Sequence, residues 1–199
     1  SFRKSTEKTM SNIIQIKELS VCYGSTCALN NINLAIKKGD FLGVIGPNGG
    51  GKTTLLRVIL GLIKPWKGSV VIGGNNMSLS KVKIGYVPQY TKFDRSFPIK
   101  VFDVILMGLV DKSALFFHRY SNRDKEMTLS IMEQIGIAGL KDRQIGQLSG
   151  GQMQKVLIAR TLVQKPAILL LDEPTASMDA FSRTKIYNIL RDLNREITI

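Results

Sequence analysis

The sequence predicts an α/β fold whose core sheet is largely parallel, and three observations carry that prediction. Short apolar runs, each bounded by glycine, proline or an acidic residue, have the length of buried strands. Segments with apolar residues at helical spacing follow several of them. A glycine-rich stretch, GPNGGGKTT at residues 46–54, joins one apolar run to one helical segment. Repeated strand–loop–helix units are typical of a parallel sheet covered by helices.

The individual elements follow from the same patterns. The first two expected strands alternate partly between apolar and polar residues, as strands with one exposed face do. The runs at 41–45 and 167–171 are apolar throughout, which indicates fully buried strands. We expect strands at 13–19, 32–36, 41–45, 68–73, 84–88 and 167–171. We expect helices at 55–63, 123–135, 149–162 and 186–193, with helical structure also from about residue 98.

The length of 199 residues fits one domain. We expect residues 1–11 to be a disordered tail and residues 12–199 to form that domain, with a helical subdomain at about 92–155. The first residues lack the apolar centre of a signal peptide. No apolar run approaches the roughly 18 residues that span a membrane.

The charge is strongly positive, at +13 overall. Residues 1–100 carry 15 basic and 4 acidic residues, so most of the excess lies in the first half. These lysines and arginines occur singly, a pattern typical of a solvated face. Contact with anionic lipid headgroups or with an acidic partner is the alternative, and the charge alone would also suit a nucleic-acid-binding protein.

Cys22 and Cys27 are the two cysteines of the chain. They are too few for a closed zinc site or for a disulfide framework. We therefore expect reduced, structural thiols in a cytoplasmic protein.

The stretch at 46–54 fits the phosphate-loop pattern G-x-x-x-x-G-K-[ST] at Gly46, Gly51, Lys52 and Thr53. Glycines let the chain curl tightly, so that successive backbone N–H groups can face a phosphate, and the helix start adds its own N–H groups. Lys52 would reach the β- and γ-phosphates and the Thr53 hydroxyl would hold Mg²⁺. A flexible turn is the alternative, but the expected strand and helix on either side favour a nucleoside triphosphate site.

A second candidate site lies at the end of the apolar run 168–171, where Asp172 and Glu173 follow directly. Charges at the tip of a buried strand need a partner, and Mg²⁺ on phosphate oxygens would be one. Asp172 would hold the metal and Glu173 would polarise the attacking water. Two solvated acids in a turn is the alternative.

A third motif, Leu148-Ser149-Gly150-Gly151-Gln152, precedes the expected helix to residue 162. It resembles the signature motif of the ATP-binding-cassette (ABC) ATPases, and the other motifs follow in that family's order. Tyr23 matches the aromatic residue that stacks on adenine, Gln89 the Q-loop glutamine, and 177–179 the D-loop, with Met178 where leucine is usual. The resemblance covers residues 13–199.

The resemblance implies a P-loop NTPase fold with a RecA-like core sheet, an N-terminal antiparallel β-subdomain and a helical signature subdomain. It implies ATP and Mg²⁺ as cofactors. The implied catalytic residues are Glu173, Gln89 and Lys52, and the implied metal ligands are Thr53, Gln89 and Asp172. The implied nucleotide contacts are Tyr23, Gly46, Asn48, Gly49, Gly51, Lys52, Thr53, Thr54, Ser149, Gly150, Gly151, Gln152 and Asp179.

Each of these residues taken singly has a simpler interpretation. Tyr23 could be a core or surface tyrosine, and Gln89 an ordinary loop amide. Ser149 could be a helix N-cap followed by a plain turn, although an N-cap and an anion site are compatible at one helix start.

The family binds ATP between the phosphate loop of one copy and the signature loop of another. The resemblance therefore implies a head-to-tail dimer, transmembrane permease subunits as partners, and an extracytoplasmic substrate-binding protein as an indirect one. It implies a peripheral location at the cytoplasmic face of the membrane. No nucleic-acid partner is expected.

The segment 93–108 resembles the ATPases of zinc, manganese and iron uptake, which favours metal uptake as the function. Its phenylalanines Phe93, Phe97 and Phe102 could instead simply fill a core. Other importers, and exporters of lipids or drugs, are the alternatives within the family.

The chain departs from the family at the switch histidine, which follows the next strand after the acidic pair. The sequence ends at Ile199, and its one histidine, His118, lies in another segment where a surface position is expected. We expect poor hydrolysis and exposed apolar surface beside an incomplete sheet.

Two other classes of protein are alternatives. A nucleic-acid-associated ABC ATPase would suit the charge, but the interval between the motifs holds no sustained heptads and no cysteines. A stand-alone nucleotide kinase would leave residues 148–152 without a purpose.

Overall fold

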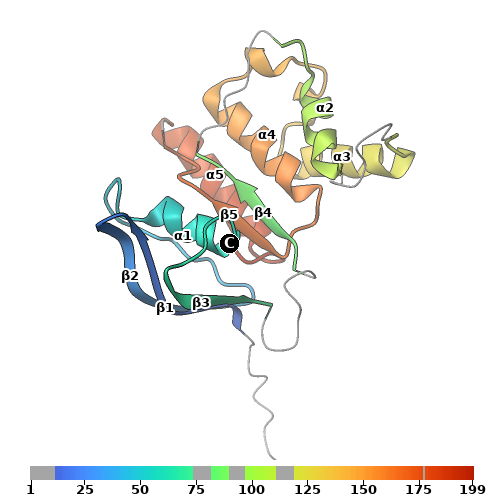
Figure 1. The fold of residues 1–199 in the computed structure, drawn as a ribbon. Coiled ribbons are helices and arrows are strands. Elements are labelled where there is room, and N and C mark those ends of the chain that lie inside the picture. The colour runs from blue at the N-terminus through green and yellow to red at the C-terminus, as the bar shows by residue number, and fades with distance from the viewer. Residues whose placement is uncertain (1–11, 74–81, 90–96, 111–118, 177) are drawn as a thin grey trace, which may run out of the picture. The chain divides into compact units, whose positions relative to one another are not determined.

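The computed structural model describes residues 12–73, 82–89, 97–110, 119–176 and 178–199 (Figure 1). The chain divides into two compact units, one formed by residues 1–82 with Thr198 and the other by residues 83–197 with Ile199. In the described parts of the chain, no helix has the length and hydrophobicity needed to cross a membrane.

The first unit contains an antiparallel sheet of three strands in the order β2-β1-β3 (Figure 1). The strands are β1 (Asn12–Tyr23), β2 (Thr26–Lys37) and β3 (Lys67–Ile72). They contain the predicted strands at 13–19 and 32–36 and most of that at 68–73, so the predicted antiparallel β-subdomain is confirmed. Ile14, Ile16 and Leu19 of β1 are almost fully buried, because the central strand is covered on its inner face.

The prediction of reduced cysteines was wrong, because the structure joins Cys22 to Cys27 in a disulfide. β1 and β2 form a hairpin with Gly24 and Ser25 at its turn, and its register places these two residues opposite each other. The prediction rested on the number of cysteines, because two are too few for a disulfide framework. The hairpin register, which brings their backbones together, decides otherwise.

The helix after the phosphate loop, α1 (Lys52–Ile59), is shorter than predicted. Gly61 has a φ of 71°, and the N–H groups of Gly61 and Leu62 donate to the carbonyls of Val58 and Arg57 at 2.9 Å. This glycine-closed helix end satisfies the last carbonyls, and it leaves Leu62 exposed beyond the helix.

The predicted buried strand at 41–45 was also wrong. The structure assigns no strand there, and the side chains of the segment are exposed, with Ile45 at 97%. An apolar run supplies strand propensity, but a strand forms only when neighbouring backbone pairs with its N–H and C=O groups. The structure records no such pairing for this segment among the described residues of the first unit.

The second unit contains a parallel pair of strands, β4 (Ile84–Val87) and β5 (Ile168–Leu171), with helices packed against it (Figure 1). Both strands lie where the sequence predicts them. The described residues of this unit form four α-helices: α2 (Val101–Leu106), α3 (Asn122–Gln134), α4 (Gly150–Leu162) and α5 (Ala180–Leu193). Three short 3₁₀ helices complete the described residues: η2 (Met107–Leu109), η3 (Ala138–Leu140) and η4 (Ile145–Gln147).

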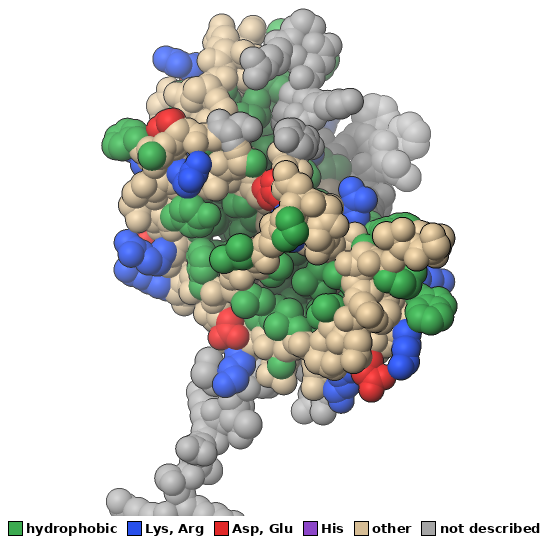
Figure 2. Space-filling model, turned by 90° about the vertical axis from the view of Figure 1, so that its left-hand side faces the viewer, with side chains coloured by type: hydrophobic (Ala, Val, Ile, Leu, Met, Phe, Trp, Pro, Cys, Tyr) green, Lys and Arg blue, Asp and Glu red, His purple; other side chains and the backbone are tan. Residues whose placement is uncertain are grey.

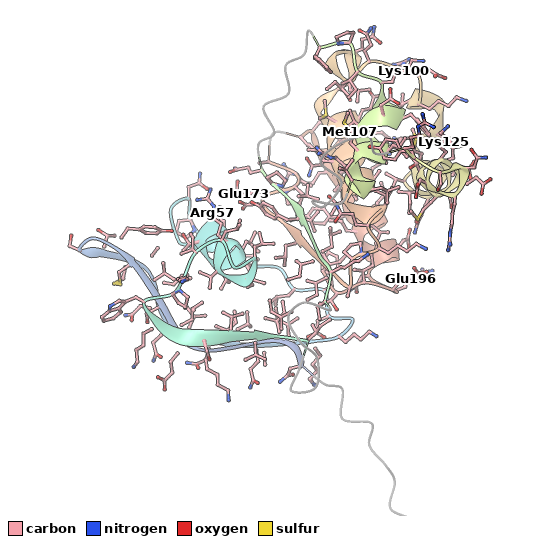
Figure 3. All side chains as sticks on the ribbon, turned by 45° about the vertical axis from the view of Figure 1, so that its right-hand side comes forward. Arg57, Lys100, Met107, Lys125, Glu173 and Glu196 are labelled. Carbon is pink, nitrogen blue, oxygen red and sulfur yellow. A yellow bond between two sulfur atoms is a disulfide. The ribbon has the colours of Figure 1, made fainter. Side chains whose placement is uncertain are left out.

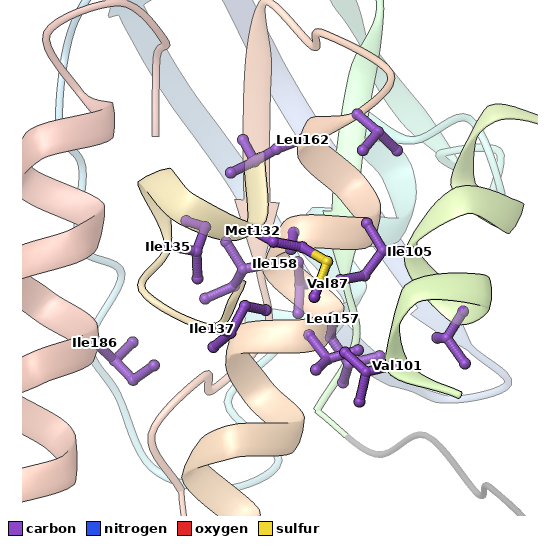
Figure 4. Packing of buried hydrophobic residues seen from close by; sticks show 14 of the residues in the cluster. Val87, Val101, Ile105, Met132, Ile135, Ile137, Leu157, Ile158, Leu162 and Ile186 are labelled. Carbon is purple, nitrogen blue, oxygen red and sulfur yellow. The ribbon is translucent and has the colours of Figure 1, made fainter. Parts of the chain in front are cut away.

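Helix α4 forms the centre of the apolar core of this unit. Val156, Ile158 and Ala159 are fully buried in a cluster that also takes in Met132 of α3 and Ile105 of α2 (Figure 4). A side chain at position 108 would clash with the backbone oxygen of Arg160. Because Gly108 has none, the turn after α2 can lie directly against α4. This packing holds the N-terminus of α4, which carries the signature residues, at a defined place in the unit.

The described phenylalanines after residue 96 differ in their surroundings. Phe97 is 59% exposed, whereas Phe102 is partly buried against the core cluster. The core interpretation therefore holds for Phe102 and is wrong for Phe97, because the chain turns outward before α2. Phe93 and His118 lie outside the described residues, as do residues 1–11. The boundaries of a helical subdomain at 92–155 stay a prediction.

Candidate functional site

The phosphate loop connects residue 45 to α1, which begins directly after Gly51. Gly49 and Gly51 have φ values of 80° and 84°, in the left-handed region that favours glycine. The Lys52 Nζ donates to the carbonyl oxygens of Gly46 and Pro47 at 3.0 and 2.9 Å. The ammonium group is therefore held across the mouth of the loop, where it would meet an anion bound by the loop.

Gly51 is the most tightly placed glycine of this loop. A Cβ at this position would collide with the backbone oxygen of Ala28 and would lie 2.9 Å from the Leu29 Cδ2. Ala28 and Leu29 belong to β2, so the loop packs directly against the hairpin that carries Tyr23. Tyr23 itself ends β1 with 53% of its surface exposed, which excludes the core interpretation and leaves its ring accessible.

Asp172 follows β5 and is 4% exposed. Its backbone N–H donates to the carbonyl of Val87 at 3.0 Å, which continues the parallel pairing one residue past the strand. The Tyr86 hydroxyl donates to the Asp172 Oδ2 at 3.4 Å. The interpretation of a solvated acid is therefore wrong for Asp172, because the sheet pairing carries it inside.

Glu173 and Gln89 meet directly, although they lie 84 residues apart in sequence. The Gln89 Nε2 donates to the Glu173 Oε2 at 2.6 Å. Each residue lies just beyond the carboxyl end of a strand, Gln89 after β4 and Glu173 after β5, and Figure 3 labels Glu173 there. Adjacent parallel strands bring their ends together, so two separate sequence motifs form one polar cluster.

Glu173 also has an unusual backbone, with a φ of 47°. A left-handed conformation costs a residue with a Cβ about 1–2 kcal/mol. Such a conformation clusters at functional sites, where the surrounding structure holds it in place. Here it aims the carboxylate of Glu173 at Gln89.

The signature residues begin α4 with a complete capping box. The Ser149 Oγ accepts from the Gln152 N–H at 3.3 Å, and the Gln152 Oε1 accepts from the Ser149 N–H at 3.0 Å. Ser149 and Gly150 are exposed. The N-cap interpretation of Ser149 is therefore right, and it leaves an anion site at the same helix start open.

The start of α5 lies beside the start of α4. Asp179 caps α5 by accepting from the Ser182 N–H at 2.9 Å, and hydrogen bonds from Ser182 hold the Asp179 pKa below its usual value. A Cβ on Gly151 would lie 3.5 Å from the Ser182 side chain. The D-loop residue Asp179 and the signature loop thus belong to one surface, while Ser177 lies outside the described residues.

A hollow of about 420 Å³ opens next to these two helix starts, with Ser149, Gln152, Lys155 and Lys185 in its lining. Burial, together with the charge of Lys185, lowers the Lys155 pKa. Two lysines that repel each other in the lining of one hollow, in the second turns of α4 and α5, favour a bound anion. Neither lysine, nor Ser182, stood out in the sequence, because each lies outside its motif, three to six residues further along a helix.

Tyr86 is a further residue that sequence reasoning missed. Its signal was available, since the alternation of β4 places residues 86 and 84 on one face and the buried residues 85 and 87 on the other. Outside these clusters, the basic side chains on the face shown in Figure 2 are dispersed among polar and apolar surface. This distribution favours a solvated face over one basic stripe.

The family described as "ABC transporter" matches residues 29–176 of this chain. The zinc uptake system ATP-binding protein ZurA of Listeria innocua is 41% identical over 189 residues, which are 94% of this chain and 73% of that protein. The manganese transport system ATP-binding protein MntB of Listeria monocytogenes is 40% identical over 180 residues, 90% of this chain and 75% of that protein.

Solved structures agree with the sequence relatives. The ADP conformation of an ATP-binding cassette of an ABC transporter matches with a TM-score of 0.81 and 28% identity, over 94% of this chain and 79% of that one. Together with the family match and the relatives at about 40% identity, this similarity shows that the chain belongs to the ABC transporter family, as an ATP-binding subunit whose ATP hydrolysis is coupled to transport.

Proposed function

We propose that this chain powers the uptake of zinc or manganese ions through a membrane permease. The observation that supports this proposal is sequence identity of about 40% to the ATP-binding proteins of a zinc and of a manganese uptake system, over nine-tenths of this chain. The resemblance of residues 93–108 to such ATPases points the same way. The ATPase does not contact the transported ion, so similarity to these relatives, and not site chemistry, supports the substrate.

ATP would be held first by the phosphate loop. The Tyr23 ring, exposed at the end of β1, would stack on adenine. Lys52, whose Nζ crosses the loop mouth, would bind the β- and γ-phosphates, and Thr54 and the loop residues Gly46, Asn48, Gly49 and Gly51 would surround them. The helix start places its N–H groups and the positive end of its dipole at the same point.

Mg²⁺ would be held by Thr53, Asp172 and Gln89. These residues offer a hydroxyl, a carboxylate and an amide oxygen, the hard oxygen ligands that this cation prefers. When bound, the cation would neutralise charge on the β- and γ-phosphates. Asp172 is nearly buried, so a cation at its carboxylate would also compensate the cost of that burial.

Glu173 would take a proton from the attacking water, and Gln89 would orient the Glu173 carboxylate and that water. The 2.6 Å hydrogen bond between them keeps the Glu173 carboxylate in one orientation. Proton acceptance by a positioned carboxylate contributes about 100- to 10,000-fold to a hydrolysis rate.

A second copy would complete the site. Ser149, Gly150, Gly151 and Gln152 would contact the γ-phosphate of the ATP held by the other copy, with Asp179 beside them. The hollow next to Ser149, with Lys155 and Lys185 in its lining, supports an anion at this place. The permease would hold the pair at the cytoplasmic face of the membrane, and an extracytoplasmic binding protein would deliver the ion.

Metal accumulation in cells tests the proposal. Cells lacking the gene would receive the wild-type chain or the Lys52→Ala variant, and uptake of radioactive zinc, manganese and rubidium would be followed. We expect the wild type alone to restore uptake of zinc or manganese, with rubidium unaffected. A Lys67→Ala variant removes an exposed positive charge away from the loop and should restore uptake like the wild type. Unchanged zinc and manganese uptake in cells without the gene would contradict the proposal.

A further inference from the structure

We propose that the Cys22–Cys27 disulfide is a redox-sensitive clamp on the nucleotide site, and that its reduction by a dithiol weakens nucleotide binding. The inference rests on the proposed function in one respect, the placing of Tyr23 and the phosphate loop at the nucleotide. It concerns regulation of that site, which the family motifs do not address.

The disulfide closes the end of the hairpin that carries Tyr23. Cys22 and Cys27 are opposite each other in the register of β1 and β2, and the four residues between them are Tyr23, Gly24, Ser25 and Thr26. The register of this hairpin is irregular on both sides of Val21, where the backbone ladder is disturbed. The covalent bond lies beyond this irregularity and therefore fixes the turn end of the hairpin.

The other side of the clamp touches the phosphate loop. Ala28 follows Cys27, and its backbone oxygen lies so close to Gly51 that a Cβ there would collide with it. Leu29, the next residue, is buried and would meet the same Cβ at 2.9 Å. The disulfide thus stands between two elements of the nucleotide site, the Tyr23 ring on one side and the Gly51 turn on the other.

The bond is accessible to a reductant. Cys27 is exposed and Cys22 is partly exposed. A thiolate of the dithiol attacks one sulfur and forms a mixed disulfide, and its second thiol displaces the cysteine. Two electrons and two protons pass from the dithiol to the protein, which leaves two cysteine thiols and one cyclic disulfide.

Reduction would release the four-residue loop and loosen its neighbour Ala28. Binding of adenine would then have to order the Tyr23 ring, which the oxidised hairpin holds in advance. Ordering one such side chain weakens binding by about three- to tenfold. We therefore expect the oxidised chain to bind nucleotide about three- to tenfold more tightly than the reduced chain.

The test is a titration of the purified full chain with a fluorescent ATP analogue, after oxidation with oxidised glutathione and after reduction with dithiothreitol. Thiol counting must give zero and two thiols, respectively, since the chain has two cysteines. The double variant Cys22→Ser and Cys27→Ser should match the reduced wild type under both conditions. Circular dichroism of each sample shows whether the fold is kept.

Equal affinity of the oxidised and reduced wild type would overturn the inference, as would a chain that keeps two free thiols after oxidation. An affinity loss accompanied by unfolding would also overturn it. If the wild type binds the analogue and Lys52→Ala does not, the nucleotide site stands whatever the redox result. Absence of binding in every form would overturn both the inference and the proposed site.

Discussion

The two helix starts that carry the phosphate-binding motifs are built differently. α1 follows Gly51, which has no side chain to cap the helix and has a φ of 84°. α4 follows Ser149, whose hydroxyl and backbone form a full capping box with Gln152. In one loop the glycine backbone and a lysine would form the proposed phosphate site, and in the other the helix end is already capped by its own side chains.

This difference suits two separate roles in the proposed binding of ATP. A loop whose only side-chain cation reaches back over its own carbonyls is arranged around a ligand. A capped helix start is stable without a ligand, so its residues keep their arrangement before a second copy binds. We therefore expect changes at the phosphate loop to affect binding of nucleotide by one copy, and changes at the signature loop to affect hydrolysis by a pair.

The largest effect should come from a change that leaves both helix starts intact. Glu173→Gln removes the proton acceptor and retains the shape of the side chain, so the steady-state ATPase rate should fall by about 100- to 10,000-fold. Affinity for a fluorescent ATP analogue should stay within about twofold of the wild type. Glu196→Gln, an equivalent change at another site, is the control. A parallel loss of binding would show that Glu173 shapes the phosphate site itself.

Gly51→Ala tests whether the start of α1 depends on bare backbone. The left-handed φ should cost about 1–2 kcal/mol, and the clash with Ala28 about 1–3 kcal/mol more, in the free energy of unfolding measured in urea. Gly39→Ala has nearly the same φ, 87°, and open space around its Cβ, so it should cost only the first amount. Equal costs at the two positions would remove the argument for close packing of the loop on β2.

Lys52→Ala tests the cation of the phosphate loop. A hydrogen bond to a charged group contributes about 1.5–3 kcal/mol, so the affinity for the ATP analogue should fall by about 10- to 100-fold. Lys67→Ala, with the same loss of charge in the same unit, should leave the affinity unchanged. A similar decrease in both variants would mean that general charge, and not the loop, attracts the nucleotide.

Ser149→Ala tests the signature loop and Ser121→Ala is its control, because each serine forms a capping box at the start of a helix. Each variant should lose about 1 kcal/mol in the free energy of unfolding. The loss of a hydroxyl at a phosphate should lower the ATPase rate of Ser149→Ala by about tenfold or more, with single-copy binding kept. Ser121→Ala should hydrolyse ATP normally. If both variants lost activity equally, Ser149 would be a structural cap and no more.

The smallest effect concerns the cap of α5. Hydrogen bonds from Ser182 lower the Asp179 pKa, so the folded state favours the carboxylate more than the unfolded state does. The resulting stabilisation is present above the unfolded pKa of about 3.9 and is lost as the pH falls through the lower folded pKa. Between pH 5 and 3, the Tm of the wild type should therefore fall slightly more than that of Asp179→Asn. If the Tm of the variant fell more steeply than that of the wild type, the Asp179 carboxylate would destabilise the folded state, contrary to this prediction.

Much of the site was readable because its chemistry lies in short contiguous motifs. Residues 46–53 predict a phosphate-binding loop, since they provide a tight glycine turn, a cation and a hydroxyl in the order of the known motif. Asp172 and Glu173 were readable because charge ends an apolar run. Lys155 and Lys185 were not readable, because each reaches its site through helix packing that a local pattern does not encode.

The errors share a cause with these omissions. The run at 41–45 has the propensity of a strand, and the described residues of its unit pair no strand with it. Cys22 and Cys27 looked too sparse for a bridge, and the hairpin register joined them.

The family, the order of the motifs and the residue types in the proposed phosphate-binding loops could be read from the sequence, because these depend on local backbone geometry and side-chain chemistry. Only the tertiary structure decided that Gln89 meets Glu173, that Gly51 rests on β2 and that two cysteines are bonded. Those contacts join residues from separate elements, and the energy that selects them comes from the pairing and packing of whole strands and helices.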